Sequence, residues 1–161
     1  MTLFEDFTDA PETRWDYVAD GVMGGVSEGQ AEFVTDGDGT AVRLTGLVST
    51  ENNGGFIQVR RRFEGGFPVA AKGLILSVKG NGEPYFVFLR TKGQKRVFHS
   101  YRFEFETTSD WEEVRMDFAD FYPSHEEMPL NFAPEDVTGI GIVAYGRAFE
   151  ADVMVRRVEV Y

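Results

Sequence analysis

The chain is divided into short runs of strand length, and no helical period of apolar residues is sustained over a dozen positions. Runs such as 41–47 and 85–91 alternate apolar and polar residues, which is typical of strands with one buried face. Clusters of Gly, Asp, Asn and Pro, as at 36–39 and 80–84, separate the runs as turns. About ten such runs without an internal repeat predict an all-β sandwich or barrel that forms one domain over residues 1–161.

The pattern also places individual elements along the chain. It predicts a hairpin that joins residues 30–35 to residues 41–47 through the Asp36-Gly37-Asp38-Gly39 turn. Residues 123–134 lack periodicity and are expected to be irregular, with a single helical turn at 133–136. Further strands are expected at 15–18, 56–63, 74–78, 85–91, 97–105, 111–118, 140–145 and 153–161.

The amino-acid composition excludes several classes of protein. The formal net charge of −11 argues against general nucleic-acid binding, because that affinity comes largely from neutralising phosphates. There is no cysteine, which excludes disulfides and thiol chemistry, and no apolar run is long enough to insert into a membrane. The first seven residues include Glu5 and Asp6 and no basic residue, whereas a targeting peptide carries basic and apolar residues there. We therefore expect a cytoplasmic protein.

Two glycine-rich corners stand out. The segment from Trp15 to Ser27 contains Gly21, Gly24 and Gly25 among apolar residues, and a second corner at 50–55 ends in Gly54-Gly55. Glycine tolerates positive φ and close approach of another chain segment, so these corners are shaped loops packed by their own side chains. Such loops serve either as structural corners or as functional surfaces.

The residues that usually carry catalysis are sparse. The chain has two histidines, His99 and His125, neither in a metal-ligand spacing, and its serines lack the context of a nucleophile elbow. No phosphate-binding or dinucleotide-binding glycine motif is present. The Asp36–Gly39 run has carboxylates at alternate positions, as calcium loops do, but a plain hairpin turn is the favoured interpretation. The sequence predicts no enzyme activity, no cofactor and no metal site.

Binding is better supported, because polar residues accompany aromatic ones on the strands. Gln58 and Arg60 share a face with Phe56, and Arg90 alternates with Phe86 and Phe88. Polar, aromatic-flanked sheet faces hold sugars or peptides in many sandwiches. The alternative is a solvated face on which long polar side chains cover apolar surface with their stems.

Several motifs resemble one known family. They are Trp15-x-x-Val18-x-Asp20-Gly21-Val22-Met23-Gly24-Gly25-Val26-Ser27, Asn52-Asn53-Gly54-Gly55-Phe56-x-x-Val59-Arg60, Lys79-Gly80-Asn81-Gly82, Leu89-Arg90-Thr91, Trp111-x-x-Val114-x-x-Asp117-Phe118 and Ile140-Gly141-Ile142. In this order and over nearly the whole chain, they resemble the complex I intermediate-associated protein family. The chain departs from the family pattern at Asn81, where Asp is usual, and at Asp117, where Pro is usual. It also has no mitochondrial leader, which suggests a bacterial stand-alone domain.

The resemblance implies a galactose-binding-domain-like β jelly roll, similar to sugar-binding modules. It also implies a non-catalytic assembly factor, because the mitochondrial members act as chaperones for assembly of respiratory NADH:ubiquinone oxidoreductase. Fold similarity alone does not establish that a domain of this type binds sugar.

Three hypotheses follow. The first is a chaperone-like adaptor for a protein partner such as a respiratory-complex assembly intermediate, with the two glycine corners shaping its contact surface. The second is a carbohydrate-binding module, for which buried Trp15 and Trp111 would be unfavourable because sugars need an exposed aromatic platform. The third and weakest is a small enzyme in which Asp20, Glu51 and Arg60 converge. The candidate binding residues are Trp15, Asp20, Met23, Ser27, Asn53, Phe56, Gln58, Arg60, Tyr85 and Arg90.

Overall fold

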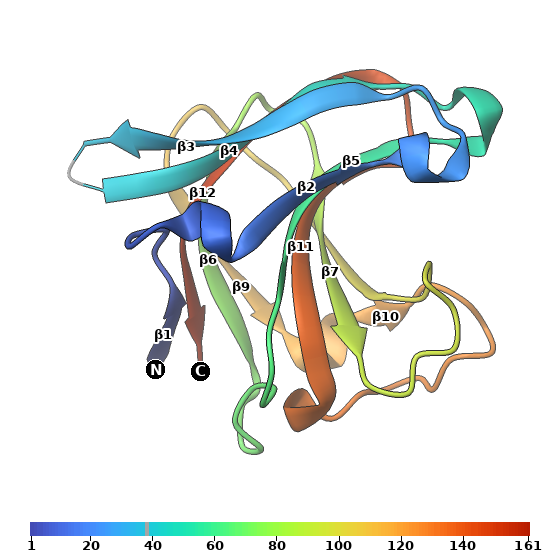
Figure 1. Ribbon diagram of the computed structural model, residues 1–161. Helices are drawn as coiled ribbons and strands as arrows, with labels where there is room; N and C mark the ends of the chain where they lie inside the picture. Colours follow the sequence, from blue (N-terminus) through green and yellow to red (C-terminus); the bar gives the residue numbers. More distant parts are fainter. Residues whose placement is uncertain (38) are drawn as a thin grey trace.

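Two antiparallel six-stranded sheets pack face to face in the computed structural model (Figure 1), which describes residues 1–37 and 39–161, apart from the side chains of Val22, Met23 and Asn53. The first sheet has the order β3-β4-β12-β6-β9, with β1 also paired to β12. The second has the order β10-β8-β7-β11-β5-β2. The predicted all-β sandwich is confirmed.

The strands have the following bounds: β1 Thr2–Glu5, β2 Trp15–Ala19, β3 Glu28–Asp36, β4 Gly39–Val48, β5 Phe56–Arg62, β6 Gly73–Gly80, β7 Tyr85–Thr91, β8 Tyr101–Phe105, β9 Glu112–Asp117, β10 Tyr122–Pro123, β11 Val137–Tyr145 and β12 Phe149–Val160. The helical elements are short 3-10 turns: η1 Pro11–Thr13, η2 Asp20–Met23, η3 Glu51–Asn53, η4 Phe118–Asp120 and η5 Pro134–Asp136. Among the described residues, no helix has the length and hydropathy needed to span a bilayer.

The core lies between the sheets and follows the period-2 alternation of the strands. Ile57 and Val59 of β5 and Val87 and Leu89 of β7 point inward, and each is at most 1% exposed. Their neighbours in sequence point to the outer face of the second sheet. The alternation read from the sequence therefore assigns the faces of this sheet correctly.

Strand β12 shows where simple alternation fails. Val153 and Val155 are buried, but so are Val158 and Val160, which belong to the opposite alternation. A register shift between Val155 and Arg157 against β6 inserts an extra residue, so both apolar sets face the core. This bulge explains why neither face of residues 153–161 looks apolar throughout.

Other predictions were partly correct. The hairpin of β3 and β4 is confirmed by pairing from Glu28↔Leu47 to Asp36↔Gly39, while Asp38 of its turn lies outside the described residues. The expected strand at 97–105 begins only at Tyr101, because the His99 amide bonds back to the Arg96 carbonyl in a turn. The helical turn expected at 133–136 is present as η5.

Candidate functional site

The two glycine corners meet around one buried carboxylate. Asp20 is fully buried, and its oxygens accept hydrogen bonds from the Ser27 amide (3.0 Å), the Ser27 hydroxyl (2.5 Å), and the amides of Gly55 (2.6 Å) and Phe56 (3.3 Å). Burial alone would raise the pKa of Asp20, but the bonds from Ser27, Gly55 and Phe56 lower it below its usual value. The carboxylate thus joins the corner after β2 to the corner before β5.

The glycines of these corners leave room for that carboxylate. A Cβ at Gly25 would lie 2.4 Å from Cγ of Asp20, and a Cβ at Gly54 would lie 2.5 Å from its Oδ2. Gly24 has a positive φ of 87° but open space around its missing side chain. The Trp15–Ser27 motif is therefore a structural latch that joins the two corners. The carboxylate of Asp20 is used for hydrogen bonds within the fold.

Trp15 and Tyr85, two further candidate residues, are also interior. Trp15 is 3% exposed and donates from Nε1 to Oε1 of Glu5 at 2.8 Å. The Tyr85 hydroxyl accepts from the Asp152 amide at 2.8 Å and donates to Oδ1 of Asn81 at 2.6 Å, which ties β7 to β12 of the other sheet. Burial raises the pKa of Tyr85 to about 12. Neither ring offers an open platform for a sugar.

The two departures from the family pattern have local partners. Asn81, besides accepting from Tyr85, donates from Nδ2 to the Glu150 carbonyl at 3.0 Å, which a carboxylate could not do. Asp117 accepts a hydrogen bond from the Tyr161 hydroxyl. Both changes are therefore accommodated by the chain's own contacts.

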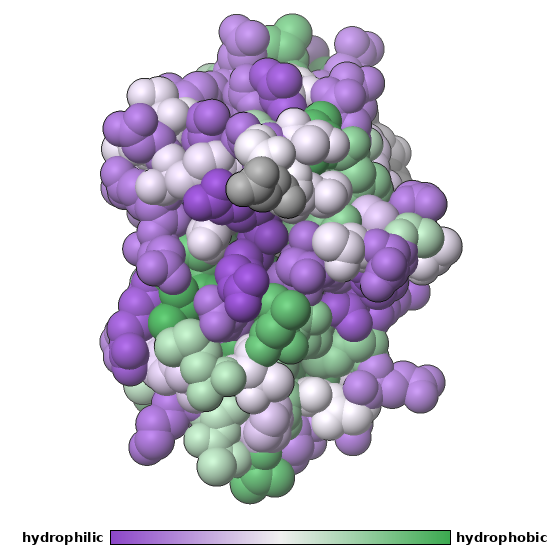
Figure 2. Space-filling view, turned by 90° about the vertical axis from the view of Figure 1, so that its left-hand side faces the viewer, coloured by the Kyte–Doolittle hydropathy of each residue, from purple (hydrophilic) through white to green (hydrophobic). Residues whose placement is uncertain are grey.

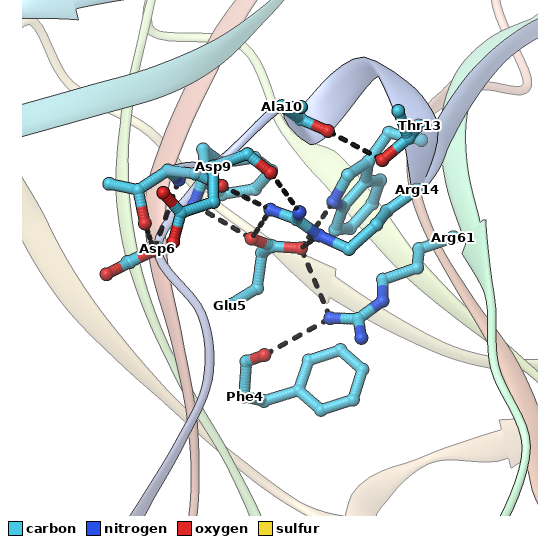
Figure 3. A network of polar contacts seen from close by, with 11 residues as sticks. Phe4, Glu5, Asp6, Asp9, Ala10, Thr13, Arg14 and Arg61 are labelled. Carbon is cyan, nitrogen blue, oxygen red and sulfur yellow. Dashed lines mark hydrogen bonds and ion pairs between the residues drawn. The ribbon is translucent and has the colours of Figure 1, made fainter.

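A second polar network lies where β1, β2 and β5 meet (Figure 3). Glu5 is 3% exposed. Its carboxylate accepts hydrogen bonds from Nε (3.0 Å) and Nη2 (2.8 Å) of Arg14 and from Nη1 of Arg61 (3.1 Å). The Arg61 guanidinium also lies 4.3 Å from the centroid of the Phe4 ring. Burial opposes ionisation of Glu5, but bonds from Arg14, Trp15 and the Phe7 amide lower its pKa. This network connects the two sheets.

The remaining described candidates, Phe56, Gln58, Arg60 and Arg90, share the outer face of the second sheet. The pairing of the strands arranges this face in rows. One row crosses all six strands as Asp16, Arg60, Gly141, Phe88, Arg102 and Tyr122. The next row consists of Arg62, Gly139 and Arg90. We call the outer surface over these two rows and the adjacent Phe56, Gln58, Phe86 and Tyr145 the outer face. The side chains of Met23 and Asn53 lie outside the described residues.

One half of the outer face is aromatic. Phe86, Phe88 and Tyr145 pack edge to face, with centroid separations of 5.6–5.9 Å. The Arg102 guanidinium lies 4.3 Å from the centroid of the Phe88 ring and 4.7 Å from that of Tyr145. The rings are half-exposed, and a cation already occupies part of the surface on which a sugar would stack. Sequence analysis did not identify Arg102 or Tyr145, which only the strand register brings to Phe88.

The other half of the outer face is basic. Arg60 and Arg62 of β5 lie on one side of β11, and Arg90 of β7 lies on the other. Between them lie Gly139 and Gly141 of β11, which are buried because neighbouring side chains cover them; a Cβ on Gly141 would lie 2.8 Å from Oε1 of Gln58. Two glycines at alternate positions of an apolar strand are the sequence signal for this close approach of side chains.

The two histidines form a separate cluster beside a hollow of about 330 Å³ near the end of β7. His99 Nε2 lies 2.8 Å from Oε1 of Glu127, whereas Ser124 Oγ lies 2.7 Å from Nδ1 of His125. The serine and the acid thus contact different imidazoles, so the contacts do not form a nucleophile relay. Within residues 1–37 and 39–161, no three acidic or histidine side chains form a group suited to a metal ion.

Figure 2 shows the side of the molecule on which the β3–β4 hairpin tip and both chain ends lie in Figure 1. This side is mostly hydrophilic with scattered apolar patches. Trp111, which directly precedes β9 of the first sheet, is half-buried and donates from Nε1 to Oδ2 of Asp36 at 2.7 Å. The Arg156 guanidinium lies 4.2 Å from the centroid of its ring. Trp111 is thus engaged by the chain itself.

Solved structures with a similar fold include several carbohydrate-binding modules. A family 11 module of a cellulosomal cellulase from Clostridium thermocellum matches with a TM-score of 0.82 and 12% identity, over 98% of this chain and 92% of that one. A family 11 module from the same organism in complex with a β-1,3-1,4-mixed-linked tetrasaccharide also gives 0.82 and 12%, over 99% and 94%. A family 30 carbohydrate-binding module gives 0.60 and 17%, over 81% and 73%. These likenesses establish a jelly-roll sandwich of the same type.

A comparison with curated protein sequences found no match. The family described as Complex I intermediate-associated protein 30 matches residues 5–153, which include both glycine corners and most of both sheets. The resemblance seen in the motifs is thereby confirmed, and the chain belongs to the Complex I intermediate-associated protein 30 family.

Proposed function

We propose that this protein is a non-catalytic adaptor that holds a protein partner against its outer face, and that the partner is an assembly intermediate of a respiratory complex. The observation that carries the proposal is the composition of this face. Half-exposed Phe88 and Tyr145 lie beside Arg102, and the same row of side chains continues across the sheet to Arg60, which forms no ion pair within the described part of the chain. Aromatic residues and arginine are the types that dominate binding energy in protein interfaces.

The name of the family supports the same class of partner, because it refers to association with complex I intermediates. The buried acids support the absence of catalysis. Asp20 and Glu5 both have lowered pKa values, and their oxygens are bonded to groups of the fold. Neither Glu51 nor Arg60 is among the hydrogen-bond partners of Asp20, so the enzyme hypothesis receives no support from these contacts.

Photo-crosslinking tests the adaptor hypothesis. A photoreactive amino acid is placed at Tyr145 on the outer face or, as matched control, at Leu47 on β4 of the other sheet; both side chains are exposed. In extract of the source cells we expect respiratory-complex subunits or assembly proteins to crosslink at position 145 and not at 47. Equal patterns at both positions, or no protein at position 145, would contradict the proposal.

Carbohydrate binding is the second candidate, and one observation favours it. Gln58 and Arg60 offer hydrogen-bond donors on the outer face, next to half-buried Phe56, on a fold shared with carbohydrate-binding modules. A glycan array with the wild-type protein and with Gln58→Ala tests it. Binding that is lost in Gln58→Ala, together with no crosslinking at position 145, would replace the adaptor hypothesis with this one.

A further inference from the structure

The guanidinium of Arg102 is held in a fixed position on the aromatic half of the outer face. It lies 4.3 Å from the centroid of the Phe88 ring and 4.7 Å from that of the Tyr145 ring. Its Nε donates a hydrogen bond to Oγ of Ser100 at 3.0 Å, and Ser100 is 4% exposed. The Ser100 amide in turn donates to Oγ of Ser124 at 3.1 Å. Two rings and one buried hydroxyl thus fix the Arg102 side chain.

The other two nitrogens of this guanidinium remain available for a ligand. Within the described part of the chain, Arg102 forms no ion pair, and neither Nη1 nor Nη2 has a hydrogen-bond partner. Neither nitrogen is among the buried side-chain atoms that lack a partner, so both reach solvent. Three other arginines that stack on rings, Arg61, Arg115 and Arg147, each have a carboxylate within 3.4 Å. Arg102 is stacked as they are, but no carboxylate of the described chain pairs with it.

The charge of the outer face differs in sign from that of the whole chain, whose formal net charge is −11. The charged residues that the strands direct to this face are Arg60, Arg62, Arg90, Arg102, Asp16 and Glu104. Glu104 follows Arg102 at the next outward position of β8, where it is exposed and lies opposite Phe86. Arginines therefore outnumber acids here, and an acidic group of a partner meets a locally positive surface.

Two exposed tyrosines border Arg102. Tyr122 of β10 lies opposite it and is 47% exposed, and Tyr145 of β11 is 36% exposed. Burial raises the pKa of Tyr122, whereas the charge of Arg102 lowers it, which agrees with a phenol close to the guanidinium. An anion bound at Arg102 is thus flanked by tyrosine rings, and tyrosine and arginine are the residue types that most often dominate protein interfaces.

We infer that Arg102 is the anchor of the outer face and binds the carboxylate of an aspartate or glutamate side chain of the partner, an inference that rests on the proposed adaptor function. A guanidinium binds a carboxylate through two parallel hydrogen bonds, here from Nη1 and Nη2. Because Arg102 is already fixed, little side-chain freedom is lost when the carboxylate binds. An apolar residue next to the acid can pack on Tyr122 or Tyr145, so the recognised segment combines an acid with an apolar neighbour.

Two other anions are less well suited to this place. A phosphate group carries about two negative charges at neutral pH, so Glu104 on the same face opposes it more strongly than a carboxylate. A uronic acid supplies a carboxylate, but its sugar ring needs a flat platform, and Phe86, Phe88 and Tyr145 pack edge to face. Both anions are contrasting outcomes of the test.

The test is titration of the ¹⁵N-labelled full chain, with NMR of the arginine Nε–H signals. The probes are the blocked tripeptide Leu-Glu-Phe, its counterparts with glutamine or phosphoserine in the middle, and glucuronate. We expect the glutamate peptide to bind best, to shift the Arg102 signal, and to bind more weakly as salt is raised. Equal or tighter binding of any other probe would overturn the assignment. So would the absence of a shift at about 10 mM glutamate peptide, well above the dissociation constant that two charge-assisted hydrogen bonds give.

Substitutions of Arg102 locate the contact. Arg102→Gln removes the charge and Arg102→Lys keeps it without the planar fork, and each should weaken binding of the glutamate peptide about tenfold. The matched control is Arg115→Gln on the first sheet, since Arg115 stacks on the Tyr161 ring at 3.9 Å but pairs with Asp117. It should leave the affinity unchanged, and thermal melts verify that all variants fold. Equal affinity of the wild type and both Arg102 variants would overturn the inference.

A substitution of Ser100 tests the fixed position of the guanidinium without changing its charge. Ser100→Ala removes the acceptor of the Arg102 Nε–H group and leaves the Ser100 amide in place. We expect ¹⁵N relaxation to show a more mobile Arg102 side chain, and the glutamate peptide to bind several-fold more weakly. Unchanged mobility and affinity would contradict the fixed guanidinium on which the inference depends.

The two proposals can fail separately. Crosslinking of a protein at position 145 that persists in Arg102→Gln would remove the anchor and keep the adaptor. A shift of the Arg102 signal by the glutamate peptide, without any protein crosslinked at position 145, would remove the adaptor and keep a carboxylate site at Arg102.

Discussion

Arg60 and Arg61 are consecutive residues of β5, yet they face opposite sides of the sheet and have opposite surroundings. Arg61 points toward the Glu5 network, where it bonds to Glu5 and to the Phe4 carbonyl at 3.1 Å each (Figure 3). Arg60 points to the outer face, where its Nε has no partner and its nearest charged neighbours include another arginine. The same side chain is thus paired within the fold at one position, and at the next it forms no ion pair among the described residues.

The difference shows that burial alone does not identify a structural charge. Both arginines are half-buried, and burial lowers the pKa of both. What separates them is a compensating carboxylate, since a buried charge with its partner is stable and one without a partner costs free energy. Four changes test this comparison, from the largest expected effect to the smallest.

Removal of the Glu5 carboxylate should have the largest effect on the free energy of unfolding. Glu5→Ala leaves Arg14 and Arg61 without their shared acid and Nε1 of Trp15 without an acceptor. We expect a loss of about 3–5 kcal/mol in the free energy of unfolding, which urea denaturation measures. The exposed Glu12→Ala is the matched control and should change stability by less than about 0.5 kcal/mol. A similar stability of the two variants would show that the network is not essential.

Removal of the Arg61 guanidinium should have a smaller effect on the free energy of unfolding. In Arg61→Gln, Glu5 keeps its bonds from Arg14, so the carboxylate remains paired. We expect a loss of about 2 kcal/mol from the hydrogen bonds and from contact with the Phe4 ring. Urea denaturation of this variant beside Arg60→Gln measures the contrast within one strand. Equal losses in the two would remove the distinction between the faces.

Acid should weaken the Glu5 network and lower the stability of the protein. The folded pKa of Glu5 lies below its ordinary value of 4.5, so its stabilisation is present above about pH 4.5 and is lost as the pH falls through the folded pKa. Asp20 contributes in the same direction, because its folded pKa is also lowered. Urea midpoints of the wild type should therefore fall between pH 5 and pH 3, and those of Glu5→Gln should fall less steeply. Parallel profiles would contradict an ionised, stabilising Glu5.

The outer arginine should matter least for stability. Arg60→Gln removes a charge that has no ion-pair partner within residues 1–37 and 39–161, and it relieves repulsion by Arg62. We expect the free energy of unfolding to change by less than about 0.5 kcal/mol, in either direction. Thermal and urea denaturation measure it. A loss comparable with that of Arg61→Gln would mark Arg60 as a structural residue.

The fold was predictable because alternation and turn chemistry are local properties. The hairpin at 30–47 and the strands at 56–63 and 85–91 follow directly from period-2 patterns and were correctly placed within a few residues. The bulge in β12 was not predictable, because it depends on pairing with β6. The turn at 96–99 was missed because Val97 and Phe98 resemble strand residues, although both are exposed in the structure.

The candidate site was predictable only in part, since proximity across strands is not visible in a single sequence. Gln58, Arg60 and Arg90 were selected for their alternation with aromatic residues and do share the outer face. Asp20 and Ser27 were selected for the motif around them, but that motif encodes the latch between two corners. Glycine patterns and buried acids are required by packing as often as by binding, so the motif alone could not separate the two.

The pairing of β1 with β12 has a practical consequence. Thr2 lies opposite Val160, so the two ends of the chain leave the molecule side by side from the first sheet (Figure 1). An affinity handle, a fluorophore or a sensor chip attached at either terminus is then anchored on the layer that does not carry the outer face. The domain can be immobilised through either end with its arginines still turned toward the solution.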